Sequence, residues 1–67
     1  MDKDIRELIV TLCTRAGMIM EDASLLAVTM LGTAPEATSA ALTRLQADAA
    51  TISALLEAAT LLTARDA

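Results

Sequence analysis

The sequence contains no histidine, no aromatic residue and a single cysteine, Cys13. One cysteine without histidine makes neither an internal disulfide nor a Cys/His metal cluster. Cys13 also lacks a neighbouring base that would convert its thiol into a nucleophile, since Arg6 and Arg15 do not form a triad. We therefore expect no enzymatic activity, no metal and no cofactor, and we interpret Cys13 as a small residue at the edge of a helix stripe.

Carboxylates are present, but in a pattern that does not favour a catalytic or metal site. Glu21, Asp22 and Glu57 are the candidates for an acid/base pair or metal ligands. Di-metal helical bundles combine inward-facing Glu with Glu-x-x-His, and histidine is missing here. Neighbouring residues on a helix also point about 100° apart. We expect these three carboxylates to lie on solvated helix faces.

Positive charge is scarce, with five Lys and Arg against nine Asp and Glu and a net charge of −4. Such an acidic chain without stacking side chains is not expected to bind nucleic acid. The longest stretch without a charged residue, 23–35, has 13 residues and contains Gly and Pro. That is shorter than the roughly 20 residues of a membrane span. The N-terminal residues also lack the pattern of a signal peptide, so we expect a cytoplasmic protein.

Glycine and proline are rare as well, with two and one respectively, which leaves long stretches without a helix breaker. Alanine, the best helix former, supplies 15 of the 37 apolar residues. A core of alanine and aliphatic side chains without aromatics must be thin, as between closely packed helices. The composition predicts one all-α domain over residues 1–67.

A heptad pattern runs through the first half of the chain and predicts a helix over about residues 4–31. Its apolar residues alternate at spacings of four and three: Ile5, Ile9, Leu12, Ala16, Ile19, Ala23, Leu26 and Met30. Gly17 interrupts the helix-forming composition at a cost of about 1 kcal/mol relative to alanine. The spacing passes Gly17 without a change of phase, so one continuous helix is favoured, with a kink or break at Gly17 as the alternative.

The ends of this first helix carry recognisable signals. Asp4 is the expected N-cap, and Glu7 completes a capping box with it. Gly32 follows the last periodic residue and suits a left-handed C-cap.

A tight turn over residues 32–34 separates the two halves. Thr33 is the expected N-cap of a second helix, Pro35 falls in its first turn, and Glu36 completes another capping box. The second helix is expected over about residues 34–64. So short a connection forces the two helices into an adjacent antiparallel hairpin.

The second helix has a seam of its own. Its expected residues are Leu42, Leu45, Ala49, Ile52, Leu56 and Ala59, extended by Thr63 and widened on one side by Leu55 and Leu62. The chain also holds nine threonines, some of which we expect to donate hydrogen bonds back to helix carbonyls.

Apolar residues outside the two seams exceed what a monomeric hairpin can bury. Leu25 and Val28 lie roughly opposite the first seam, and Met18 is the methionine most suited to a contact surface rather than to core filling. We therefore predict a homodimer that forms a four-helix bundle, while a tetramer or a hetero-complex with another helical chain also fits. The expected interface residues are Ile5, Ile9, Leu12, Met18, Ile19, Leu25, Leu26, Val28, Met30, Leu45, Ile52, Leu55, Leu56 and Leu62.

These features favour a non-enzymatic protein–protein interaction module, a self-associating adaptor or regulator. One alternative is a surface-active coat or membrane-peripheral protein, although helices of that kind usually carry more Lys and Arg than this chain. Another is a carrier of a small apolar ligand in the bundle core.

Overall fold

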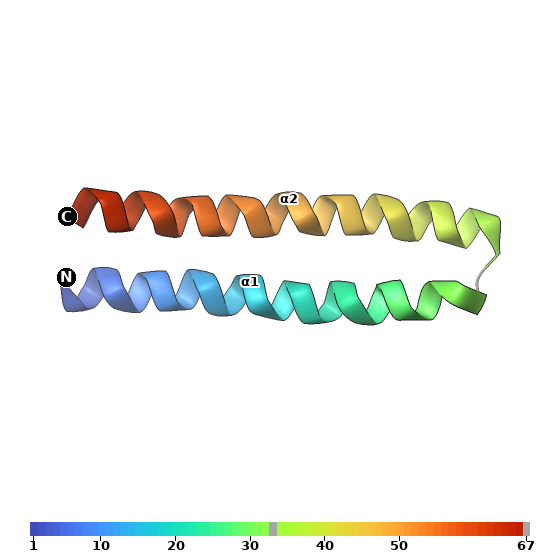
Figure 1. The fold of residues 1–67 in the computed structure, drawn as a ribbon, viewed down its shortest axis with the longest axis horizontal. Coiled ribbons are helices and arrows are strands. Elements are labelled where there is room, and N and C mark those ends of the chain that lie inside the picture. Colours follow the sequence, from blue (N-terminus) through green and yellow to red (C-terminus); the bar gives the residue numbers. More distant parts are fainter. Residues whose placement is uncertain (33, 67) are drawn as a thin grey trace.

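Two long helices lie side by side and make up almost the whole molecule (Figure 1). The computed structural model describes residues 1–32 and 34–66, except for the side chain of Leu31. Helix α1 spans Lys3–Thr29, a short 3₁₀ helix η1 spans Met30–Gly32, and α2 spans Pro35–Asp66. The helices run antiparallel, and both termini lie at the same end (Figure 1). The prediction of an all-α hairpin is confirmed.

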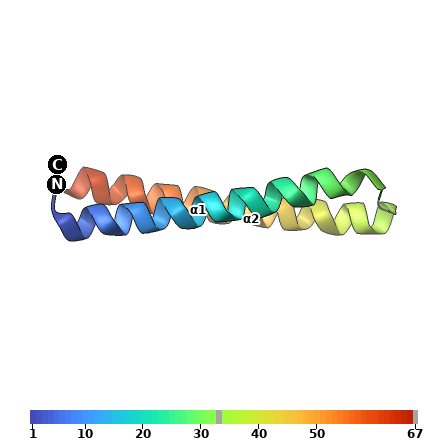
Figure 2. The same ribbon diagram turned by 90° about the horizontal axis from the view of Figure 1, so that it is seen from below.

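The helices wind about each other along a rod of 49 × 14 × 11 Å. In the view of Figure 2, α1 crosses in front of α2 near the middle of the hairpin. A strict seven-residue repeat imposes this winding, because the seam of a straight helix drifts away from its partner with every heptad.

Helix α1 continues through Gly17 without a break. A Cβ placed on Gly17 would meet no atom within 4 Å, so no close neighbour requires glycine there. The preference for one continuous helix is therefore confirmed, because seam packing on both sides of Gly17 outweighs its low helix propensity.

The N-terminus of α1 is capped by Asp2, and the prediction of Asp4 is wrong. Asp2 Oδ1 accepts a hydrogen bond of 2.7 Å from the backbone N–H of Asp4, which lies inside the first turn. Asp2 is as good a cap as Asp4, and starting the helix two residues earlier adds backbone hydrogen bonds. The backbone N–H of Asp2 also donates to Asp66 Oδ2 at 3.1 Å, which ties the start of α1 to the end of α2.

The left-handed C-cap expected at Gly32 is also not observed, because no described residue has a positive φ. Instead the last turn of α1 tightens, and the backbone N–H of Met30 donates to the carbonyl of Ala27. A 3₁₀ turn of this kind satisfies carbonyls at a helix end without a left-handed residue.

Helix α2 begins at Pro35, whose missing N–H costs nothing at the first helical position. The carbonyl of Ala34 accepts the first hydrogen bond of this helix, from the N–H of Thr38 at 2.9 Å. Glu36 lies in the first turn, as expected. The capping role predicted for Thr33 lies outside the described residues.

The seam predicted for α1 is the face that packs against α2. All eight of its residues are buried or half-buried, and Ala16 is only 1% exposed. Apart from Gly17, every other described side chain of α1 is exposed. The heptad pattern is therefore confirmed residue by residue in this helix.

The seam predicted for α2 is correct in only half of its positions. Leu45, Ile52 and Ala59 are at least half-buried, whereas Leu42, Ala49 and Leu56 are exposed. The observed row is Thr38, Ala41, Leu45, Asp48, Ile52, Leu55, Ala59, Leu62 and Asp66. Helix α2 is turned so that Leu55 and Leu62, expected only to widen the stripe, lie at its centre. This rotation covers Leu55 and Leu62 and uncovers Leu42 and Leu56, so each row offers two leucines and one alanine, and apolar burial alone does not choose between them.

Asp48 is the one charged side chain in the middle of the seam among the described residues. Its side chain is 15% exposed and pairs with Arg44 of the preceding turn, at 3.2 Å between Nε and Oδ1. A polar group at a core position of paired helices costs stability but favours one register over others.

The expected back-bonding of threonines is confirmed. Seven hydroxyls donate to a carbonyl three or four residues earlier, those of Thr11, Thr29, Thr38, Thr43, Thr51, Thr60 and Thr63. Each hydroxyl is satisfied within its own helix, so its methyl group can lie against a neighbouring surface without a second polar partner.

The capping role of Asp2 predicts unequal effects of two aspartate substitutions. Asp2→Ala should lower the free energy of unfolding by about 1 kcal/mol, because it removes the side-chain acceptor for the Asp4 amide. Asp4→Ala should cost less, since it removes only a favourable charge near the positive end of the helix dipole. Urea unfolding followed by circular dichroism at one protein concentration measures both, and a larger loss in Asp4→Ala would contradict the assignment.

The position of Asp48 in the seam predicts that leucine would make the hairpin more stable than aspartate does. Asp48→Leu should raise the free energy of unfolding by about 1 kcal/mol, because an apolar side chain replaces a half-buried carboxylate. Arg44→Ala should lower it by about 0.5 kcal/mol, the usual contribution of an i,i+4 ion pair. The same unfolding assay tests both, and a destabilised Asp48→Leu would show that the carboxylate is needed for the native register.

Candidate interaction surface

The hairpin encloses very little of itself. Among the described residues only Ala16, Ala41 and Ala59 are buried, and no large side chain is fully covered. The chain exposes 5030 Å², whereas a compact monomer of this mass exposes roughly 4,000 Å². The radius of gyration is 15.5 Å, against about 11 Å for a compact domain of this length. We therefore look for a functional site on the exposed surface of the hairpin and not in an enclosed cavity.

The residues predicted for a subunit interface divide into two groups. The first group is half-buried between α1 and α2 of the same chain, and consists of Ile5, Ile9, Leu12, Ile19, Leu26, Met30, Leu45, Ile52, Leu55 and Leu62. The second group is exposed and consists of Met18, Leu25, Val28 and Leu56. The contact between α1 and α2 of one chain therefore already half-buries ten of the fourteen residues that were predicted for the subunit interface.

Further exposed apolar residues form two rows beside the seam. Each member follows a seam residue by four positions, as Met20 follows Ala16 and Leu56 follows Ile52. Such a residue lies about 40–50° farther round the helix, always in the same rotational sense. Because α2 runs antiparallel to α1, the two rows come to lie on one side of the hairpin. We call this side the uncharged face; its residues are Cys13, Met20, Ala27, Leu42, Ala49 and Leu56.

The exposed fractions agree with this placement. Met20, Leu42 and Leu56 are 45%, 50% and 40% exposed, as expected for side chains that lean against the seam. Met18 and Leu61, which lie farther round their helices, are 63% and 64% exposed. The three large residues of the uncharged face are thus partly covered by the hairpin and partly available to another surface.

The opposite side of the hairpin carries charge. It includes four charged residues that each lie three positions after a seam residue: Arg15 and Asp22 on α1, and Arg44 and Arg65 on α2. The uncharged face has no charged residue between Cys13 and Ala27 on α1 or between Leu42 and Leu56 on α2 along its rows. The nearest charged residue in these rows is Arg6, toward the end of the rod with the termini. The two sides therefore differ in charge although both are rich in aliphatic groups.

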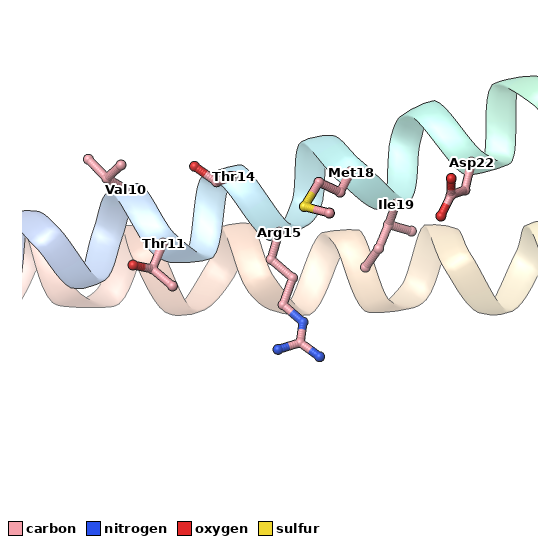
Figure 3. A pocket seen from close by; sticks show the side chains of 7 residues that line it. All are labelled: Val10, Thr11, Thr14, Arg15, Met18, Ile19 and Asp22. Atoms are coloured by element: carbon pink, nitrogen blue, oxygen red, sulfur yellow. The ribbon is translucent and has the colours of Figure 1, made fainter.

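A shallow depression of about 580 Å³ lies along the charged side of α1 (Figure 3). Its lining comes from one helix only, namely Val10, Thr11, Thr14, Arg15, Met18, Ile19 and Asp22. Figure 3 shows Ile19 pointing toward α2, and Val10 and Thr14 pointing away from it. The depression is an open strip of helix surface and brings together no set of groups for a reaction.

The residues considered for chemistry lie apart from one another on the surface. Cys13, Glu21, Asp22 and Glu57 are all exposed. In the described part of the chain no three His, Cys, Asp or Glu side chains come close enough to hold a metal ion. Met20 and Leu42 were not among the residues expected at the interface, yet both are exposed. The spacing of Met20 from the first seam already places it beside that seam, whereas the place of Leu42 depends on the rotation of α2.

Helix α2 also meets the length and composition of a membrane span. It contains an 18-residue window of mean hydropathy 1.2 with at most two charged residues, and 6% of that window is buried in the hairpin. The longest charge-free stretch does not coincide with this window, because the charges of α2 are few but spread along the helix. By length and composition alone, the expectation that no segment could span a membrane is thus wrong.

Comparison with known proteins does not assign the hairpin to a family. No family model, no curated protein and no solved structure matches the chain. The function of the hairpin must therefore be inferred from the shape and chemistry of its surface.

Proposed function

We propose that this chain is a non-enzymatic helical interaction module that acts as a self-associating adaptor or regulator. Two hairpins associate into a homodimeric four-helix bundle, and the bundle offers its remaining helical surface to another protein. The observation that supports this most strongly is the imbalance, among the described residues, between a core of three alanines and ten large apolar side chains that stay exposed.

The energetics favour association. Covering one Leu or Met side chain completely contributes about 1.5–3 kcal/mol, and a small domain has only a few kcal/mol of stability in total. Burial of a few more side chains per chain is therefore large on this scale. The excess surface of about 1,000 Å² per chain, estimated from mass scaling, is similar to the roughly 800 Å² that each partner buries in a standard interface.

The acidic charge of −4 directs the choice of partner. Repulsion of phosphate by this chain argues against nucleic acid. Another amphipathic helical protein fits better, since it can cover aliphatic rows at helical spacing. We place this activity in the cytoplasm.

Light scattering coupled to size-exclusion chromatography tests the dimer directly. Each chain has a mass of 7.0 kDa, and we expect twice that mass at micromolar concentration. The unfolding midpoint should rise with protein concentration, because association stabilises only the folded chain. A compact monomer with a concentration-independent midpoint would overturn the proposal.

Contact with a lipid bilayer is the second candidate, and the hydropathy of α2 favours it. Flotation with phosphatidylcholine vesicles, with and without anionic lipid, separates the two. We expect the protein to stay at the bottom of the gradient, because dimerisation covers the apolar rows and the chain has a single Lys and four Arg to hold an anionic surface. Co-migration with either vesicle would favour the membrane function instead.

A further inference from the structure

We infer that the second copy docks on the uncharged face, with both hairpins pointing in the same direction and each large side chain of one face opposite a small one of the other. This inference rests on the proposed homodimer and specifies its interface. It follows from the order of side-chain sizes along the face, from its lack of charge, and from the area that the hairpin leaves exposed.

The uncharged face alternates in size. The hydrogen bond from the backbone N–H of Asp2 to Asp66 Oδ2 marks the register of the antiparallel helices, in which residues whose numbers add to about 68 lie at the same level. Three levels of the face follow from this register. Each level holds one large and one small side chain: Leu42 with Ala27, Met20 with Ala49, and Leu56 with Cys13. The large member lies on α2, then on α1, then on α2 again, so the face is a zigzag of projections and recesses.

A twofold axis parallel to the rod makes this face complementary to itself. It lays α1 of one hairpin over α2 of the other at the same level, and all neighbouring helices in the bundle are then antiparallel. Every projection meets a recess, and the pairs are Leu42 with the partner's Ala27, Met20 with the partner's Ala49, and Leu56 with the partner's Cys13. Close packing of this kind is what stabilises helix interfaces, because dispersion contacts are lost across even small gaps.

A twofold axis across the rod would point the hairpins in opposite directions and fit poorly. Centred on the middle level, it sets Met20 against the partner's Met20 and Leu42 against the partner's Leu56. Ala27 would then face the partner's Cys13 across a gap that the large pairs hold open. Collisions of large side chains and voids between small ones both cost stability. Side-chain size therefore selects the arrangement with both turns at the same end.

Charge selects this face over the opposite one. Docking on the uncharged face removes no charged group from water over its three levels, whereas the opposite side would bury Arg15, Asp22 and Arg44. Taking an ionised side chain out of water costs several kcal/mol per ion before any pairing offsets it, and interface centres are depleted in charged residues. A dimer formed here leaves Met18, Leu25 and Leu61 outside the interface, where a different helical partner could bind.

Two methionines provide a matched test of the face. Met20 lies on the uncharged face and Met18 does not, and both are exposed in the hairpin. Neither substitution to glutamate therefore removes a core side chain. Met20→Glu should weaken dimerisation on the order of 100-fold, since it buries two carboxylates per dimer, while Met18→Glu should leave the dissociation constant within about threefold. Analytical ultracentrifugation measures both constants, and circular dichroism checks that the helices persist.

The direction of the hairpins is tested by a distance between spin labels. Cys13→Ala removes the native thiol, and Glu36→Cys then places one label near the turn of each chain. With both turns at one end, the labels should lie about 20–30 Å apart across the bundle. Hairpins in opposite directions would place them about 40 Å apart, because about 26 residues of helix rise separate the two positions.

The outcomes separate this inference from the function on which it rests. A wild-type chain that stays monomeric in light scattering overturns both. A wild-type dimer that tolerates Met20→Glu as well as Met18→Glu, or that gives the longer label distance, overturns only the proposed face and direction. A dimer that is lost in Met20→Glu, kept in Met18→Glu and short in label distance supports the inference.

Discussion

The close approach of two helices through small and aliphatic side chains is the interaction on which this molecule depends. Ala16 on α1 and Ala41 and Ala59 on α2 are the buried residues of the described chain, and between them Leu and Ile side chains are only half covered. A seam one side chain deep brings two helices together but cannot surround its own residues. The lateral sides of the hairpin therefore remain open.

Those open sides connect the fold to the proposed function. A two-helix rod has more surface per residue than a compact domain, and in this chain much of that surface is aliphatic. The usual ways of stabilising a small fold, a disulfide or a metal, require residues that this sequence does not supply. Association with a second helical hairpin would provide the missing layer and leave another surface for a different partner.

The two helices differ in how well their patterns predicted packing. In α1 the rows beside the seam are mostly small or charged, with Cys13 and Ala27 on one side and Arg15 and Asp22 on the other. Every expected position of this seam packs against α2. In α2 two adjacent rows are almost equally apolar: one contains Leu42 and Leu56, the other Leu55 and Leu62. A rotation of one position exchanges them. The local pattern could not choose, and the choice also determined which residues form the uncharged face.

The sequence by itself determined the helices, their number, the tight turn at Pro35 and therefore the antiparallel hairpin, because periodicity, helix propensity and proline act within a few residues of chain. It also indicated the surplus of apolar surface. Only the tertiary structure decided the rotation of α2, the place of Asp48 in the seam and the N-cap of α1 at Asp2, whose backbone N–H donates to Asp66 of the other helix. These features depend on free energies summed along the whole contact between two helices, which neither helix encodes alone.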